Sequence, residues 1–199
     1  MDITQYIDLE SYSSSPAFLG YTDQGEFSEA AIEPICDDFL EKMASYMGDV
    51  TVISSLYINS IMEEVAQDYD RALEEIDGFL SALLKYSMVK IIDFGAIARK
   101  YPPETAEFDR EFRKLETTFT FLDTPGETTL KAILRAFFRG AGLQGHLFLV
   151  FKSAELIVYP HTDDLGFGFI AMNNKRSKEK KEELHTLFGP LSGAGGKKK

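Results

Sequence analysis

Three short runs of apolar and β-branched residues near the end of the chain constrain its fold more than any other feature. They span residues 146–151, 155–159 and 167–172, and turn-forming residues separate them. Runs of this length and spacing are typical of consecutive antiparallel strands joined by short loops. The sequence therefore predicts a three-stranded meander. A helix over 179–188 is predicted to follow it and to stop at Gly189 and Pro190.

The first half of the chain is predicted to be helical. Ser28 is a suitable N-cap for a helix that runs to about Met47, because apolar residues recur there every three or four positions. A longer helix is predicted from about Ser55 to Tyr86. Its apolar side chains, from Ile58 to Leu83, also advance by threes and fours, so they form one stripe.

The intervening elements complete the predicted fold, which is α+β. The pattern indicates a strand over 88–94, a short helix after Pro103, a strand over 117–122 and a helix over 127–139. Strands bunched late in a chain favour α+β over a doubly wound parallel sheet. We predict one domain over 1–190, with a helical part over about 1–87 and a mixed sheet part over about 88–190, and a flexible basic tail over 191–199. An N-terminal helical half with a long acidic helix thus precedes a C-terminal antiparallel three-stranded meander followed by a helix.

Charge is distributed unevenly along the chain. Residues 1–80 hold eighteen acidic and two basic side chains, a formal charge of −16, whereas residues 173–199 carry +5 and the chain as a whole −11. An acidic half repels nucleic acid and anionic lipid and attracts a basic protein surface. The sequence therefore predicts a basic protein partner, no nucleic acid and no membrane.

The predicted helix over 55–86 carries most of the candidate binding residues. Acidic side chains stand between its apolar steps, and Arg71 is the one basic residue among them. An ordinary solvated helix face mixes Lys and Glu at i,i+4 spacing, so this composition indicates either a solvated flank of a core helix or a negative ridge that a partner binds. The candidate partner-binding residues are Glu63, Glu64, Asp68, Asp70, Glu74 and Glu75.

A second candidate site lies in the predicted loop between the last two strands. His161, Asp163 and Asp164 supply imidazole and carboxylate groups, which are ligands for divalent metals. The segment Asp-Asp-Leu-Gly is also typical of a turn, in which Asp caps backbone amides and Gly166 takes a positive φ. Three interpretations stand: a turn, a metal or acid–base site, and a segment that binds a partner. No cofactor is predicted.

Two further motifs carry no predicted chemistry. Gly140, Gly142 and Gly145 form a Gly-x-Gly-x-x-Gly pattern, but they follow a predicted helix and precede a strand, the reverse of the order in dinucleotide-binding sites. Cys36 lies on an apolar helix face among acidic residues, which raises a thiol's pKa, so we interpret it as a core residue.

The cellular compartment is predicted from indirect signals. One cysteine allows no intrachain disulfide and fits a reducing compartment. The first residues lack the basic and apolar regions of a secretory signal, and the longest apolar runs are far shorter than the roughly twenty residues of a membrane helix. We therefore expect a cytoplasmic protein.

The segment from Val158 to Ala171 resembles the closing part of a bacterial protein family of unknown function. That family has a strand ending in Tyr, then Asp-Asp-Arg-Gly, then a strand ending in Ile-Ala, then a helix. Matching positions are Tyr159, Asp163, Asp164, Gly166, Ile170 and Ala171, while Leu165 replaces the family's Arg. The similarity covers roughly residues 128–188. It implies a small α+β protein of the kind often found near toxin–immunity systems, and it implies no catalytic residue.

These observations lead to three functional hypotheses. The first is a protein of the inhibitor or immunity type that binds a basic partner through its acidic surface. The second is a metal-dependent hydrolase or nucleotide-handling enzyme centred on His161, Asp163 and Asp164. The third is a structural subunit that self-associates through the long helix. We expect the first, and so a binding protein rather than an enzyme.

Overall fold

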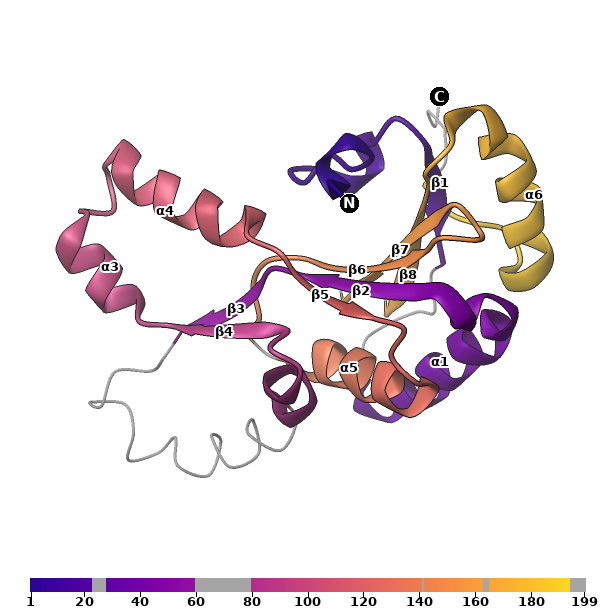
Figure 1. Ribbon diagram of the computed structural model, residues 1–199, viewed down its shortest axis with the longest axis horizontal. Helices are drawn as coiled ribbons and strands as arrows, with labels where there is room; N and C mark the ends of the chain where they lie inside the picture. The colour runs from indigo at the N-terminus through magenta and orange to yellow at the C-terminus, as the bar shows by residue number, and fades with distance from the viewer. Residues whose placement is uncertain (23–27, 60–79, 141, 163–164, 194–199) are drawn as a thin grey trace.

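The computed structural model describes residues 1–22, 28–59, 80–140, 142–162 and 165–193 (Figure 1). Within them, the main element is a six-stranded sheet in the order β1-β8-β7-β6-β2-β5, in which all neighbouring strands are antiparallel. Val52 of β2, for example, pairs with Leu149 of β6 on one side and Leu122 of β5 on the other. The strands are β1 (Phe18–Tyr21), β2 (Val50–Ser54), β5 (Thr120–Asp123), β6 (Leu147–Phe151), β7 (Leu156–His161) and β8 (Gly166–Ala171).

The α+β class is confirmed, but the predicted division into a helical half and a three-stranded meander is wrong. β6, β7 and β8 do pair in succession, yet they form the interior of a larger sheet that takes β1 and β2 from the part predicted to be helical. All five residues of β2 are buried. A strand that is buried on both faces lacks the polar–apolar alternation by which strands are recognised.

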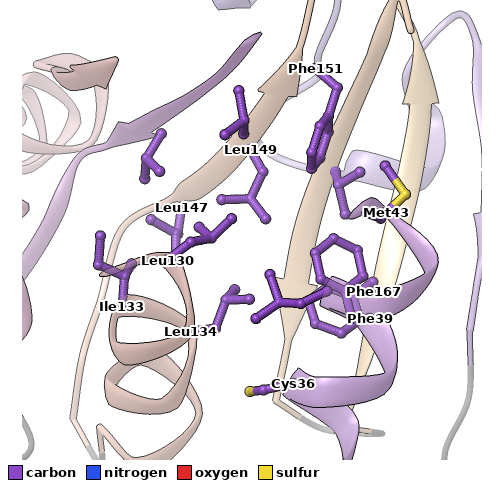
Figure 2. Close-up of a cluster of buried hydrophobic side chains, with 14 of the residues drawn as sticks. Cys36, Phe39, Met43, Leu130, Ile133, Leu134, Leu147, Leu149, Phe151 and Phe167 are labelled. Carbon is purple, nitrogen blue, oxygen red and sulfur yellow. The ribbon is translucent and has the colours of Figure 1, made fainter. Parts of the chain in front are cut away.

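Three helices pack on one face of the sheet. They are α1 (Glu29–Lys42), α5 (Glu127–Arg139) and α6 (Ser177–Phe188). The Ser28 hydroxyl caps α1 by accepting a hydrogen bond from the Ala31 N–H, as its sequence position predicts. Figure 2 shows how α1 and α5 meet the strands, with Phe39 stacked on Phe167 of β8 at 3.9 Å between ring centroids. The main core lies between these helices and the sheet.

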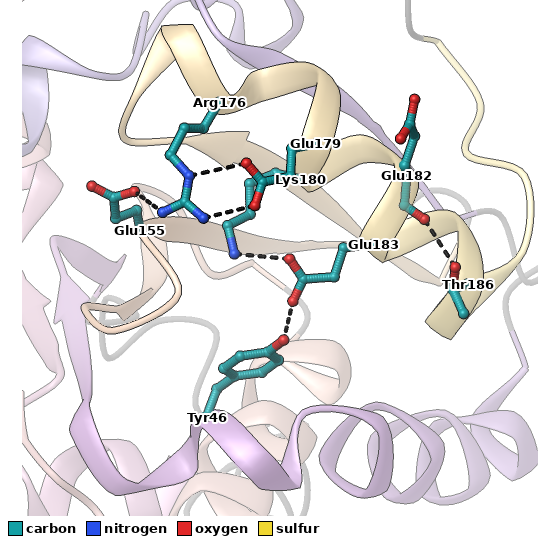
Figure 3. Close-up of polar contacts among 8 residues, drawn as sticks. All are labelled: Tyr46, Glu155, Arg176, Glu179, Lys180, Glu182, Glu183 and Thr186. Carbon is teal, nitrogen blue, oxygen red and sulfur yellow. Dashed lines mark hydrogen bonds and ion pairs between the residues drawn. The ribbon is translucent and has the colours of Figure 1, made fainter.

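Polar contacts fix α6 against the rest of the fold (Figure 3). The Lys180 ammonium, largely buried, donates to Glu183 at 2.8 Å, and the Tyr46 hydroxyl donates to the other oxygen of that carboxylate. Arg176 pairs with Glu155, in the β6–β7 connection, and with Glu179 of α6, each at 2.8 Å. Tyr46 belongs to the 3₁₀ helix η3 (Ala44–Asp49), and Arg176 to η5 (Asn174–Arg176). The helix is therefore held at both its start and its middle.

The N-terminal residues cover the opposite face of the sheet. They form two 3₁₀ turns, η1 (Ile3–Gln5) and η2 (Tyr12–Ser14). Ile3 and Ile7 are buried there in a second apolar cluster with strand residues that include Phe148 and Ile157. The N-terminal segment thus closes a second layer of the core.

A separate unit projects from β2. It consists of β3 (Leu56–Asn59) and β4 (Val89–Ile92), which pair in parallel, followed by α3 (Phe94–Lys100) and α4 (Ala106–Thr117). We call these four elements the arm. Figure 1 places α3 and α4 at the opposite end of the molecule from α1 and α6.

The predicted long helix over 55–86 is wrong at its start. Its first residues form strand β3 instead, residues 60–79 lie outside the described residues, and residues 80–85 are helical. The pairing of Leu56 with Val89 connects residues far apart in the sequence. Local periodicity carries no information about such a partner. Among the described residues, we find no helix with the length and apolarity needed to cross a membrane.

Candidate functional site

The acidic residues predicted to bind a partner lie outside the described residues. This holds for Glu63, Glu64, Asp68, Asp70, Glu74 and Glu75. The structure does describe the point from which their segment departs. Asn59 ends β3, and its side-chain oxygen accepts a hydrogen bond from the Phe94 N–H at 3.1 Å, at the start of α3. The most acidic stretch of the chain therefore begins on the arm.

Several acidic residues of α1 have basic partners within the fold. Lys131 of α5 binds Glu33 and Asp37 at 2.6 and 2.5 Å, and Arg135 binds Glu33 at 2.8 Å. Arg139 adds a longer contact with Glu29 at 3.7 Å. Basic side chains of α5 thus neutralise part of the N-terminal negative charge through ion pairs. On the described part of α1, basic side chains of α5 therefore interrupt the acidic surface.

His161 ends β7, and its predicted companions Asp163 and Asp164 lie outside the described residues. Among the residues that the structure does describe, no group of three His, Cys, Asp or Glu side chains is placed to hold a metal. The turn differs from the expected one, because Leu165 adopts the positive φ, 41°, whereas Gly166 belongs to β8. Gly166 must be small because it packs closely against Thr22 and His161.

His161 belongs to a cluster of aromatic side chains that we call the tyrosine box. Together with Ser13, its four members line a hollow of about 240 Å³. The rings of Tyr21 and His161 meet edge to face at 5.4 Å, and those of Tyr12 and Tyr159 lie 4.4 Å apart with planes inclined by 54°. The four members come from η2, β1 and β7 and are Tyr12, Tyr21, Tyr159 and His161.

Three of these rings rest directly on glycines. A Cβ atom at Gly168 would lie 2.0 Å from the Tyr159 ring, and one at Gly193 would lie 2.3 Å from the Tyr21 ring. A Cβ at Gly166 would lie 2.9 Å from Nε2 of His161 and 2.0 Å from the Thr22 carbonyl oxygen. Such approaches are far below van der Waals contact. The positions of three rings of the box therefore depend on glycine.

Burial keeps two phenols of the box, those of Tyr12 and Tyr159, protonated. It raises the pKa of Tyr159 to about 12 and raises that of Tyr12 as well. Burial also lowers the pKa of His146, whose Nδ1 forms a hydrogen bond with the Tyr12 hydroxyl. This bond ties η2 to the start of β6.

A larger hollow of about 490 Å³ adjoins the box and shares Tyr12 and His161 with it. The end of α5 and the loop that follows, with Arg139, Gly142 and Leu143, form its other side. The Gly-x-Gly-x-x-Gly pattern lies in this loop between a helix and a strand, as the sequence indicates. Gly142 and Gly145 have positive φ values of 83° and 89°, so loop geometry accounts for both.

The arm presents a second candidate surface, made of partly exposed apolar side chains. Phe112 of α4 packs against Phe94 and Phe108 at 5.0 and 4.7 Å between centroids. Neither α3 nor α4, both described throughout, contains a buried residue. Ile91 of β4 is 60% exposed.

Sequence reasoning identified one member of the box, His161, and missed the three tyrosines. The available signal was the alternation of Gly166 and Gly168 opposite the aromatic positions of the preceding strand. Glycine facing an aromatic residue on the next strand marks a place where a ring lies on the backbone. Tyr12 and Tyr21 carried no such signal, because only the tertiary fold brings them to β7.

A scan against protein-family models and searches of curated proteins and of solved structures found no match.

Proposed function

We propose that this chain is a protein-binding protein of the inhibitor or immunity type, which holds a basic partner at the arm. The observation that carries the proposal is the attachment of the most acidic segment to the arm. Residues 60–79 contain seven acidic side chains and one basic one, and the segment leaves β3 at Asn59, beside the start of α3. The chain thus enters its most acidic segment at the end of the fold that carries partly exposed apolar side chains.

The two kinds of surface have complementary roles in binding. Carboxylates attract a basic partner, speed its association and disfavour acidic competitors. Aromatic side chains such as Phe108 and Phe112 supply the desolvated contact that provides most of the affinity in protein interfaces. The single cysteine supports a reducing, cytoplasmic location for this interaction.

The test is capture of a basic protein from the source cell, followed by titration calorimetry with the captured protein after its identification. We expect affinity to fall steeply as salt is raised. The variant E63Q/E64Q removes two charges and should weaken binding about five- to thirtyfold at low salt, since each charge pair contributes roughly 0.5–1 kcal/mol. Binding that is insensitive to salt would contradict the proposal.

A matched control separates a local site from general charge. E41Q/E182Q removes the same two negative charges from exposed positions on α1 and α6, which Figure 1 places away from the arm. We expect this variant to bind like the wild type. Equal weakening by both variants would indicate an effect of net charge alone, without a site at the arm.

A further inference from the structure

We propose that the tyrosine box binds a small organic cation with a quaternary ammonium group, such as choline. This inference is independent of the proposed partner at the arm. It concerns the opposite face of the fold from the main core, where the N-terminal turn η2 meets β1 and β7.

The geometry of the rings supports this ligand. The planes of Tyr21 and His161 are inclined by 85° and those of Tyr159 and His161 by 50°, so the rings stand at angles around the hollow instead of forming one flat stack. Aromatic faces carry negative electrostatic potential and attract cations held within about 6 Å. Inclined rings present that potential from several directions at once.

The size of the hollow and the burial of its walls agree with a small head group. Its volume is about 240 Å³, and Tyr159, only 6% exposed, forms its buried part, whereas Tyr12, Tyr21 and His161 are partly exposed. A ligand can therefore enter from solvent and meet the Tyr159 ring inside. Only Ser13 adds an aliphatic hydroxyl to the described lining.

The electrostatics favour a weakly hydrated cation over a metal ion. No Asp, Glu, Lys or Arg side chain is among the described residues that line the box. A small metal ion needs oxygen or nitrogen ligands to replace its water, which these rings do not provide. A quaternary ammonium has little hydration to lose and is recognised by aromatic cages. Because Tyr12 and Tyr159 remain neutral phenols, the attraction comes from the ring faces.

The glycines indicate that the box is held ready before a ligand binds. Gly168, Gly166 and Gly193 each lie so close behind a ring that any larger residue would displace it. The Tyr12 hydroxyl is bound to His146 as well. Rings fixed in this way lose little conformational freedom on binding, which increases affinity.

The test uses choline and its uncharged isostere 3,3-dimethyl-1-butanol, titrated into the full chain at constant ionic strength and followed by NMR and calorimetry. We expect saturable one-site binding of choline and about tenfold weaker binding of the isostere, which lacks the cation–ring attraction. Equal binding of the two compounds would overturn the proposal, as would the absence of saturable choline binding.

Variants locate the site. Tyr21→Leu removes a partly exposed wall and should weaken choline binding about tenfold, whereas Tyr21→Phe should retain it, because a phenyl ring keeps the attractive face. Tyr101→Leu is the matched control, since Tyr101 lies after α3 on the arm. Circular dichroism and melting temperature confirm that each variant folds. Equal losses in Tyr21→Leu and Tyr101→Leu would overturn the assignment to the box.

Discussion

The ring of Tyr159 lies against the backbone of Gly168, its partner in the β7–β8 register. A Cβ added at Gly168 would approach the ring to 2.0 Å. The contact joins two adjacent strands on the face covered by the N-terminal turns, and it sets the position of the buried ring of the tyrosine box. A single residue without a side chain is thus required both for the sheet and for the proposed ligand site.

Replacement of Gly168 by Ala should therefore destabilise the protein. We expect a loss of about 1–3 kcal/mol in the free energy of unfolding, as for other overpacked cores, measured by urea denaturation. Gly48→Ala is the control, because no heavy atom lies within 4 Å of the added Cβ there. A loss in Gly168→Ala no larger than in the control would contradict the close packing.

The stack between Phe39 and Phe167 should be among the most stabilising contacts of the main core. Phe39 is 1% exposed and joins α1 to β8. Phe39→Ala should cost about 3–5 kcal/mol, as expected for a large buried aromatic, in chemical denaturation. Phe121→Ala removes the same atoms from a side chain that is 51% exposed. Its cost should be below about 1 kcal/mol, and similar costs for both variants would show that the core is assigned wrongly.

Stability should fall in acid partly through Glu183. Burial acts to raise the pKa of this carboxyl, but hydrogen bonds from Lys180 and Tyr46 outweigh it and lower the pKa below the usual 4.5. A carboxyl whose pKa is lower in the folded state stabilises the fold above its unfolded pKa, and this contribution is lost as the pH falls through the folded value.

In the variant Glu183→Gln, the free energy of unfolding should therefore fall less steeply as the pH drops from about 5 to about 3. This range covers the unfolded pKa of the carboxyl and the values below it. Denaturant titrations across that range measure it. Glu182→Gln changes the exposed neighbour on the same helix and should retain the wild-type slope. If both variants have the wild-type slope, Glu183 does not contribute to the acid sensitivity.

The metal hypothesis for His161, Asp163 and Asp164 can be separated from the binding function by melting temperature. We expect Mg²⁺, Mn²⁺ and Zn²⁺ to leave the melting temperature of the wild type unchanged, because His161 packs among aromatic rings. A metal that binds the folded state raises it. An increase that D163N/D164N abolishes would establish the metal site instead. Self-association of the chain remains a prediction, which light scattering can test.

The candidate sites differ in how far the neighbouring residues in the sequence predict them. His161 was recognisable from the residues beside it in the sequence, because polar and turn-forming residues cluster there. The walls that Tyr12 and Tyr21 supply come from η2 and β1, which meet β7 only in the folded chain. The same holds for the ion pairs of Glu33 with Lys131 and Arg135, which join residues about a hundred positions apart in the sequence.

The sequence by itself determined the elements whose signal is local. The helix Glu127–Arg139 was predicted with these bounds, the Ser28 cap was predicted, and the three C-terminal strands follow their apolar runs. Periodicity, capping and turn residues act over a few positions, so a single segment carries them. The α+β class follows from such elements.

Only the tertiary structure decided how β2 inserts between β6 and β5, and that Leu56–Asn59 is a strand instead of the start of a helix. Strand pairing depends on hydrogen bonds to residues distant in the chain, and burial on both faces removes the alternation that would reveal a strand. The tyrosine box arises in the same way. Gly166 and Gly168 mark the ring positions on the adjacent strand, but no local pattern shows that Tyr12 and Tyr21 meet β7.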